Sequence, residues 1–110
     1  MVEDPSRKAH MAMVKYPGKL PVYIGAALDE KYVPDLDRHL YLIDRDFTVG
    51  QVVAIIRKRI NIQPKYAIFV FVGDGILPPT SANISQVYLE HKSPIDAMLH
   101  ITYRAEQTFG

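Results

Sequence analysis

The sequence predicts a single α+β domain in which one amphipathic helix covers one face of a mixed β-sheet. Two patterns carry this prediction: apolar residues recur at helical spacing over residues 48–60, and short β-branched or alternating apolar segments lie on both sides of them. The chain has 110 residues, of which 48% are hydrophobic and 23% charged, which suits one globular domain. This composition excludes disordered, collagen-like and coiled-coil proteins.

Charge and cysteine content exclude several classes of function. The 13 basic and 12 acidic residues nearly balance, so we expect no nucleic-acid partner. Cysteine is absent, which removes disulfides, thiolate metal sites and a cysteine nucleophile. The longest apolar run, residues 66–72, is far shorter than the roughly 20 residues that span a bilayer, and the polar start lacks a signal-peptide core. We therefore expect a cytoplasmic protein.

The first residues are expected to form an arm over 1–15, either helical after Pro5 or frayed. A strand is predicted next, over residues 19–28. Pro21 indicates that this strand lies at a sheet edge or that the strand begins here, because proline cannot donate to a hydrogen-bond ladder.

The centre of the chain combines a strand with the clearest helix. A charged connection over residues 29–37 leads to a strand predicted over 38–43. Thr48 and Gln51 have capping-box spacing at the start of a helix. The basic residues 57–59 fall in its last turn, where they complement the helix dipole. One stripe of this helix is apolar and is made of Val49, Val52, Val53, Ile56 and Ile60.

The C-terminal half is predicted to contain a central strand, a short helix and a last strand. The β-branched and aromatic run 67–72 suits a buried strand, and a glycine-containing turn at 73–75 leads to a short strand at 76–77. Residues 84–88 have helical spacing, with Ser81 or Asn83 as the cap. Residues 97–103 alternate as a last strand, followed by a polar tail.

The residues that enzymes and metal sites need are not grouped in the sequence. The histidines at positions 10, 39, 91 and 100 never occur four residues apart on one predicted helix. No serine lies in a nucleophile-elbow motif. We therefore expect no catalytic residue, no metal site, no cofactor and no enzymatic activity.

Four segments resemble one family. They are DLDRHLYLI (35–43), FTVGQVVAIIRKRI (47–60), ILPPTSANISQVYLEH (76–91) and AEQTFG (105–110). Together they resemble the GABARAP-like and light-chain-three-like ubiquitin-like modifiers of autophagy. The resemblance implies a ubiquitin-like β-grasp fold with a short N-terminal helical arm. It divides the chain into an arm (1–15), a β-grasp domain (16–104) and a flexible tail (105–110).

The same resemblance implies that Gly110 is a conjugation site. In the family, a cysteine protease exposes a C-terminal glycine. Activating and conjugating enzymes then join that glycine to phosphatidylethanolamine, and the protease later removes the lipid. The resemblance thus implies a cytoplasmic protein that is monomeric before conjugation and that joins the autophagosome membrane once lipidated. The alternative is a ubiquitin-like interaction domain that is never conjugated.

The family also binds short aromatic-x-x-aliphatic motifs of cargo receptors at a sheet edge. Matching positions place one group of residues around an aromatic pocket and a second group around an aliphatic pocket, with Lys19 and Arg38 beside them. For the apolar members the alternative is ordinary core packing. The aromatic-pocket group is Pro21, Tyr23, Leu40, Leu42 and Met98, and the aliphatic-pocket group is Tyr41, Ile43, Val52, Ile55 and Arg59.

Three phenylalanines are implied as contacts for the processing and conjugating enzymes. Phe69 and Phe71 lie on one face of their predicted strand, where core packing is the alternative role, and Phe109 lies in the tail. Leu40, Asp44 and Met98 depart from the family pattern, which usually has a basic residue, a proline and an aromatic residue there.

Overall fold

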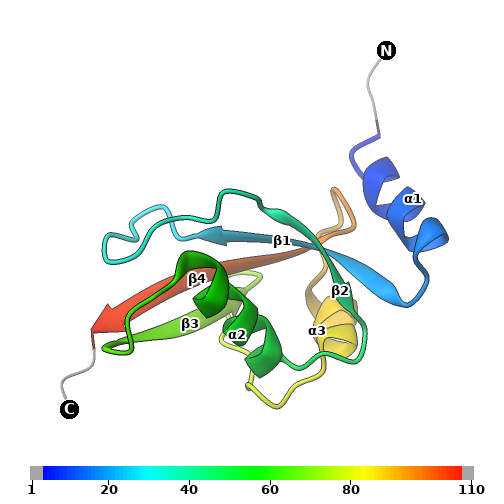
Figure 1. The fold of residues 1–110 in the computed structure, drawn as a ribbon. Helices are drawn as coiled ribbons and strands as arrows, with labels where there is room; N and C mark the ends of the chain where they lie inside the picture. Colours follow the sequence, from blue (N-terminus) through cyan, green and yellow to red (C-terminus); the bar gives the residue numbers. More distant parts are fainter. Residues whose placement is uncertain (1–3, 108–110) are drawn as a thin grey trace.

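The computed structural model describes residues 4–107 and shows a helix and a four-stranded sheet packed as two layers (Figure 1). In the described part, the elements follow in the order α1, β1, β2, α2, β3, α3 and β4. Their bounds are α1 Arg7–Lys15, β1 Lys19–Ala26, β2 Leu40–Asp44, α2 Val49–Ile60, β3 Tyr66–Val72, α3 Ile84–His91 and β4 Leu99–Gln107. The sequence-based prediction of an α+β fold is confirmed.

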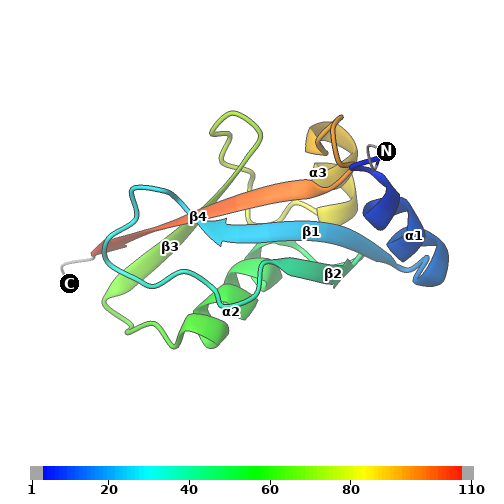
Figure 2. The ribbon, with the colours of Figure 1, turned by 90° about the horizontal axis from the view of Figure 1, so that it is seen from above.

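The sheet has the strand order β2-β1-β4-β3. The central strands β1 and β4 are parallel, whereas β2 pairs with β1 and β3 pairs with β4 in antiparallel fashion. Helix α2 crosses one face of the sheet, and the first helix α1 lies at one end of the molecule (Figures 1 and 2). Strands β2 and β3 are therefore the two edges.

Pro21 lies in a central strand, so the edge interpretation of this proline is wrong, although the alternative of a strand beginning fits. Its Cα partner in β2 is Leu42, and β1 meets β4 only from Val22 onward. Residues 19–21 thus pair on one side alone. The missing N–H of Pro21 faces the unpaired side, where no ladder bond is lost.

Helix α2 follows its local sequence signals closely. The Thr48 side chain accepts the N–H of Gln51, and the Gln51 side chain accepts the N–H of Thr48 at 2.8 Å, which completes the predicted capping box. Asn61 ends the helix in the left-handed conformation at φ 51°. Val52 and Ile56 are buried against the sheet.

The last part of the chain differs in extent from the prediction. Ile76 forms an isolated bridge with Val72 and no strand of its own. Asn83 is the N-cap of α3, but its side chain makes no capping hydrogen bond. Strand β4 begins at Leu99, because Ala97 has a positive φ of 59°, and it continues to Gln107.

The extension of β4 corrects the predicted tail. Residues 105–107 pair with the first residues of β3, from Tyr66 to Ile68. Their polar side chains suggested a tail, but Ala105 is buried and continues the alternation of the strand. Tertiary pairing, rather than local pattern, extends this strand.

The N-terminal arm is helical from Arg7 to Lys15, so the helical alternative holds for these residues. Ala9 is fully buried. The Tyr88 hydroxyl of α3 donates to the carbonyl of Ala97 at 2.5 Å, and its oxygen lies 3.6 Å from the sulfur of Met13. The arm is thereby joined to α3 and to the loop before β4.

Candidate functional site

The outer edge of β2 carries backbone groups that pair with no other strand of residues 4–107. The Ile24 N–H donates to the His39 carbonyl at 2.8 Å, which fixes the alternation of hydrogen-bonded pairs along β1 and β2. Tyr41 and Ile43 consequently bond to β1, whereas the N–H and C=O of Leu40 and Leu42 point away from it. Because β2 is the last strand on this side of the sheet, an extended peptide can pair with these groups.

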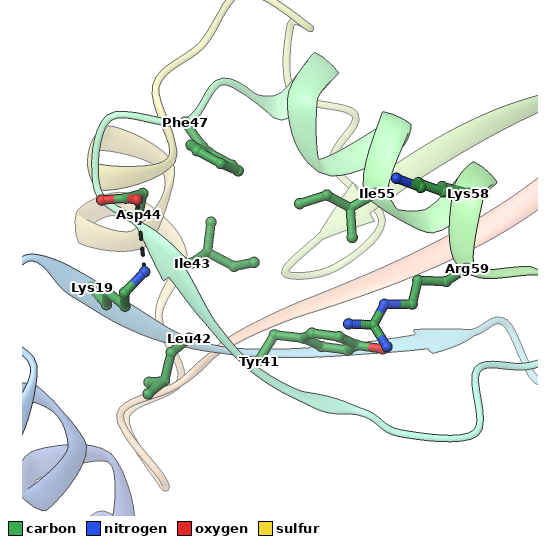
Figure 3. Close-up of a pocket in the computed structure, with 9 residues that line it drawn as sticks. All are labelled: Lys19, Tyr41, Leu42, Ile43, Asp44, Phe47, Ile55, Lys58 and Arg59. Atoms are coloured by element: carbon green, nitrogen blue, oxygen red, sulfur yellow. Dashed lines mark ion pairs between the residues drawn. The ribbon is translucent and has the colours of Figure 1, made fainter.

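A hollow of about 620 Å³ opens between β2 and α2 (Figure 3). Ile43, Phe47 and Ile55 converge on its apolar interior. The Arg59 guanidinium lies over the Tyr41 ring at 5.6 Å, and the Tyr41 hydroxyl donates to the Arg38 carbonyl at 2.7 Å. The full lining is Lys19, Tyr41, Leu42, Ile43, Asp44, Phe47, Ile55, Lys58 and Arg59.

A narrower hollow of about 180 Å³ lies on the other face of the sheet, between β2 and α1. Leu40 and Leu42 each remain 38% exposed beside it. Figure 3 shows Leu42 pointing away from Ile43, as expected for neighbours on a strand. The full lining is Lys8, Ala12, Pro21, Val22, Leu40, Tyr41, Leu42 and Met98.

Tyr23 continues this face as the middle ring of a stack. His39 and His100 lie on either side of it, with ring centroids 5.2 and 5.3 Å away. Nε2 of His39 lies 2.9 Å from an Asp35 carboxylate oxygen, and Nε2 of His100 lies 2.7 Å from an Asp96 carboxylate oxygen. Tyr23 is thus held in place by two histidines, and each histidine is itself positioned by an aspartate carboxylate.

The two carboxylates of this stack also bind backbone groups. Burial alone would raise the pKa of Asp35, but the N–H of Ala26, His39 and other donors lower it below the ordinary value. The pKa of Asp96 is likewise lowered, because the N–H of Met98 and then His100 outweigh burial. Both side chains therefore favour the charged form in the folded state.

Most residues predicted for the motif site gather around β2, but three do not line either hollow. Val52 is 0% exposed and packs in the core, as its alternative role expects, and its pocket role stays a prediction. Tyr23 lies in the histidine stack, and Arg38 contributes its carbonyl to Tyr41. Those that line a hollow are Lys19, Pro21, Leu40, Tyr41, Leu42, Ile43, Ile55, Arg59 and Met98.

The sequence reasoning missed six lining residues, one of which, Val22, lies between the predicted Pro21 and Tyr23. Phe47 directly precedes the N-cap Thr48, the position at which a residue often packs on the first turn of a helix, and this signal was available. Asp44 and Lys58 adjoin predicted residues. Lys8 and Ala12 come from α1, and no local pattern indicates that α1 packs beside β2.

Phe69 and Phe71 are half-buried on the face of β3 that points away from α2. Ile68, Val70 and Val72 occupy the opposite face and join the core, whereas the two phenylalanines do not. Their contact with enzymes stays a prediction. Phe109 and Gly110 lie outside the described residues.

Within residues 4–107 the structure contains neither a candidate membrane span nor a candidate metal cluster. No helix within residues 4–107 has the length and apolar character to cross a bilayer. In that same range, no three or more histidine, aspartate or glutamate side chains are grouped as metal ligands would be.

The four-stranded mixed sheet with one crossing helix and an open edge defines a small ubiquitin-like protein. The family described as autophagy protein Atg8 ubiquitin like matches residues 6–110. Autophagy-related protein 8d of Arabidopsis thaliana is 47% identical over 106 residues, covering 94% of this chain and 86% of the relative. Autophagy-related protein 8 of Schizosaccharomyces pombe is 50% identical over 96 residues, covering 87% of this chain and 77% of the relative.

Comparison with a solved structure points to the same family. The crystal structure of Trypanosoma brucei ATG8 superposes with a TM-score of 0.85 at 30% identity and covers 96% of this chain and 89% of that chain. The chain belongs to the Atg8 family of ubiquitin-like autophagy proteins.

Proposed function

We propose that this protein is a modifier that is conjugated through Gly110 to phosphatidylethanolamine and then binds aromatic-x-x-aliphatic motifs of cargo receptors and other autophagy proteins. The observation that best supports motif binding is the unpaired edge of β2 between two hollows. Backbone pairing supplies affinity at the edge, and the hollows supply specificity for alternate side chains of the peptide. The protein acts as a substrate and adaptor, and it catalyses no reaction itself.

The hollows suit the two anchor residues. The space between β2 and α2 is lined by Ile43, Phe47 and Ile55 and accepts the aliphatic residue. The aromatic residue lies on the side of Leu40, Leu42 and α1. Burial of each anchor contributes about 1.5 to 3 kcal/mol, so a micromolar affinity near −8 kcal/mol is reachable after association costs.

The conjugation chemistry proceeds in four steps. The Gly110 carboxylate attacks the α-phosphate of ATP, forming an acyl-adenylate and releasing pyrophosphate. A cysteine thiolate of the activating enzyme then displaces AMP to give a thioester, which is transferred to a cysteine of the conjugating enzyme. The amine of phosphatidylethanolamine attacks that thioester, forms an amide and releases the thiol. A cysteine protease later hydrolyses the amide and releases the lipid. The location is cytoplasmic before conjugation and the autophagosome membrane afterwards.

Motif binding is tested by calorimetry with an aromatic-x-x-aliphatic peptide. Leu42 lines both hollows and Ile55 lines the one beside α2, so Leu42→Ala and Ile55→Ala should each weaken binding by about 1 to 3 kcal/mol. Leu89→Ala is the matched control, because Leu89 is an equally apolar, 67% exposed side chain on α3. Equal binding by all three variants, or no binding by the wild type, would refute the assignment.

A further inference from the structure

Helix α1 forms one wall of the hollow of about 180 Å³ beside β2. Lys8 and Ala12 lie four residues apart, so they share one side of the helix, and both line the hollow. Ala9 is fully buried, and the sulfur of Met13 lies 3.6 Å from the Tyr88 hydroxyl oxygen, which holds the helix against the rest of the fold. The helical wall is therefore a fixed part of the hollow.

The size of this hollow suits a single aromatic ring. An apolar cavity of about 150 Å³ is large enough to bind benzene. The hollow has a similar volume, about 180 Å³, and Leu40 and Leu42 border it with apolar side chains. A phenyl or phenol ring therefore fits this space better than the two fused rings of an indole.

The side chains that line the hollow offer a strong hydrogen-bond donor but no strong acceptor. Among the described residues that line it, only Lys8 is charged, and an ammonium group donates hydrogen bonds and accepts none. The Tyr41 ring lies beside Arg59 (Figure 3), and its hydroxyl donates to the Arg38 carbonyl at 2.7 Å. Met98 contributes a thioether, which is a weak acceptor. The side chains of the lining thus suit a ligand that accepts a hydrogen bond.

The three aromatic side chains differ in what they can do beside Lys8. Lys8 is exposed and has no ion-pair partner among residues 4–107, so its ammonium can donate to a ligand. A tyrosine hydroxyl accepts such a bond, phenylalanine has no polar group, and the indole N–H of tryptophan is only a donor. A cation favours the face of tryptophan over that of tyrosine, but at an exposed lysine this preference is smaller than the loss from a buried, unbonded N–H.

We propose that this hollow selects tyrosine as the aromatic residue of the motif, and that Lys8 determines this preference by donating a hydrogen bond to the tyrosine hydroxyl. The preferred partner is thus a peptide with a tyrosine-x-x-aliphatic core. The inference rests on the proposed function and deepens it by naming the aromatic residue. The volume of the hollow and the donor in its wall are independent observations, and both favour a phenol ring.

The test measures, by calorimetry, the affinities of three peptides that differ only in having tyrosine, phenylalanine or tryptophan at the aromatic position. Each peptide is titrated into the full wild-type chain and into Lys8→Met, which keeps an unbranched side chain but removes the donor. Lys15→Met is the matched control. Lys15 belongs to the same helix, but its ammonium lies over Tyr16 at 5.4 Å and it does not line the hollow.

The wild type should bind the tyrosine peptide about fivefold or more tightly than the tryptophan peptide, and about threefold or more tightly than the phenylalanine peptide. Lys8→Met should bring the tyrosine-to-phenylalanine affinity ratio to about one, and Lys15→Met should leave that ratio as in the wild type.

Two kinds of failure can be told apart. If the wild type bound the tryptophan peptide as tightly as the tyrosine peptide, or if Lys8→Met kept the tyrosine-to-phenylalanine ratio, the inference would be overturned while motif binding stood. Loss of the ratio in Lys15→Met would also overturn it, because the effect would then follow from net charge rather than from Lys8. If the wild type bound none of the three peptides, motif binding itself would be refuted, and the inference with it.

Discussion

At the scale of single residues, a few side chains and backbone angles hold the loops that border the site. Ala97 adopts a left-handed φ of 59°, and its carbonyl accepts the Tyr88 hydroxyl. Asp35 and Asp96 each join a histidine of the Tyr23 stack to a backbone N–H. None of these roles is visible in local sequence, because each depends on a partner that only the fold brings near.

Ala97→Gly should stabilise the protein. A left-handed residue with a Cβ costs about 1 to 2 kcal/mol, and glycine removes that cost while losing about 0.5 to 1 kcal/mol in backbone entropy. We expect the free energy of unfolding in urea to rise by roughly 0.5 to 1 kcal/mol. Ala54→Gly, at an exposed helical position of α2, should instead lower it by about 1 kcal/mol. A loss of stability in Ala97→Gly would show that the positive φ carries no strain.

The Asp35 and Asp96 carboxylates should make stability depend on acid pH. Their pKa values are lowered by folding, so the stability they supply is present above the unfolded value near 3.8 and is lost as pH falls through the folded value. Urea unfolding from pH 7 to pH 2.5 should show this loss, and Asp96→Asn should make it smaller. Asp74→Asn serves as the control, since Asp74 accepts no hydrogen bond from the described residues. If Asp96→Asn lost as much stability between pH 7 and pH 2.5 as the wild type does, Asp96 would not be a source of the acid dependence.

At the scale of elements, local pattern predicts an element well when its own residues determine it. Helix α2 begins at the predicted residue because Thr48 and Gln51 satisfy its first turn. Strand β4 was predicted too short, since its last residues are held by pairing with β3. The same limit applies to the site: the β2 residues were identified through the family resemblance, whereas Lys8 and Ala12 enter only through packing of α1.

The two N-caps offer a direct comparison of capping energies. Thr48→Ala removes a side chain that accepts the Gln51 N–H, so it should lower the free energy of unfolding by about 1 kcal/mol. Asn83→Ala at α3 removes a cap that makes no side-chain hydrogen bond and should cost much less. Urea denaturation of both variants checks the difference. Equal losses would mean that the capping box contributes no more than an unbonded cap.

At the scale of the whole molecule, the fold separates two surfaces. The motif site runs along the β2 edge, and the surface around the end of β4, where it pairs with the start of β3, lies apart from it. Tyr103 lies between them, and its hydroxyl donates to the Pro34 carbonyl at 2.7 Å. Burial, together with the charges of Asp35 and Glu30, raises the pKa of Tyr103 to about 12. The sequence predicted the α+β class and its central helix, but this division of surfaces required the strand order.

The central claim is conjugation at Gly110, and mass measurement tests it most directly. The wild-type chain is incubated with activating and conjugating enzymes, ATP and liposomes that contain phosphatidylethanolamine. The account predicts a mass increase of one phosphatidylethanolamine minus water, located on the C-terminal peptide, and a strongly reduced yield for Gly110→Ala, whose side chain obstructs the enzymes' narrow channels. An unmodified wild-type mass, or an equal yield of conjugate from Gly110→Ala, would contradict it.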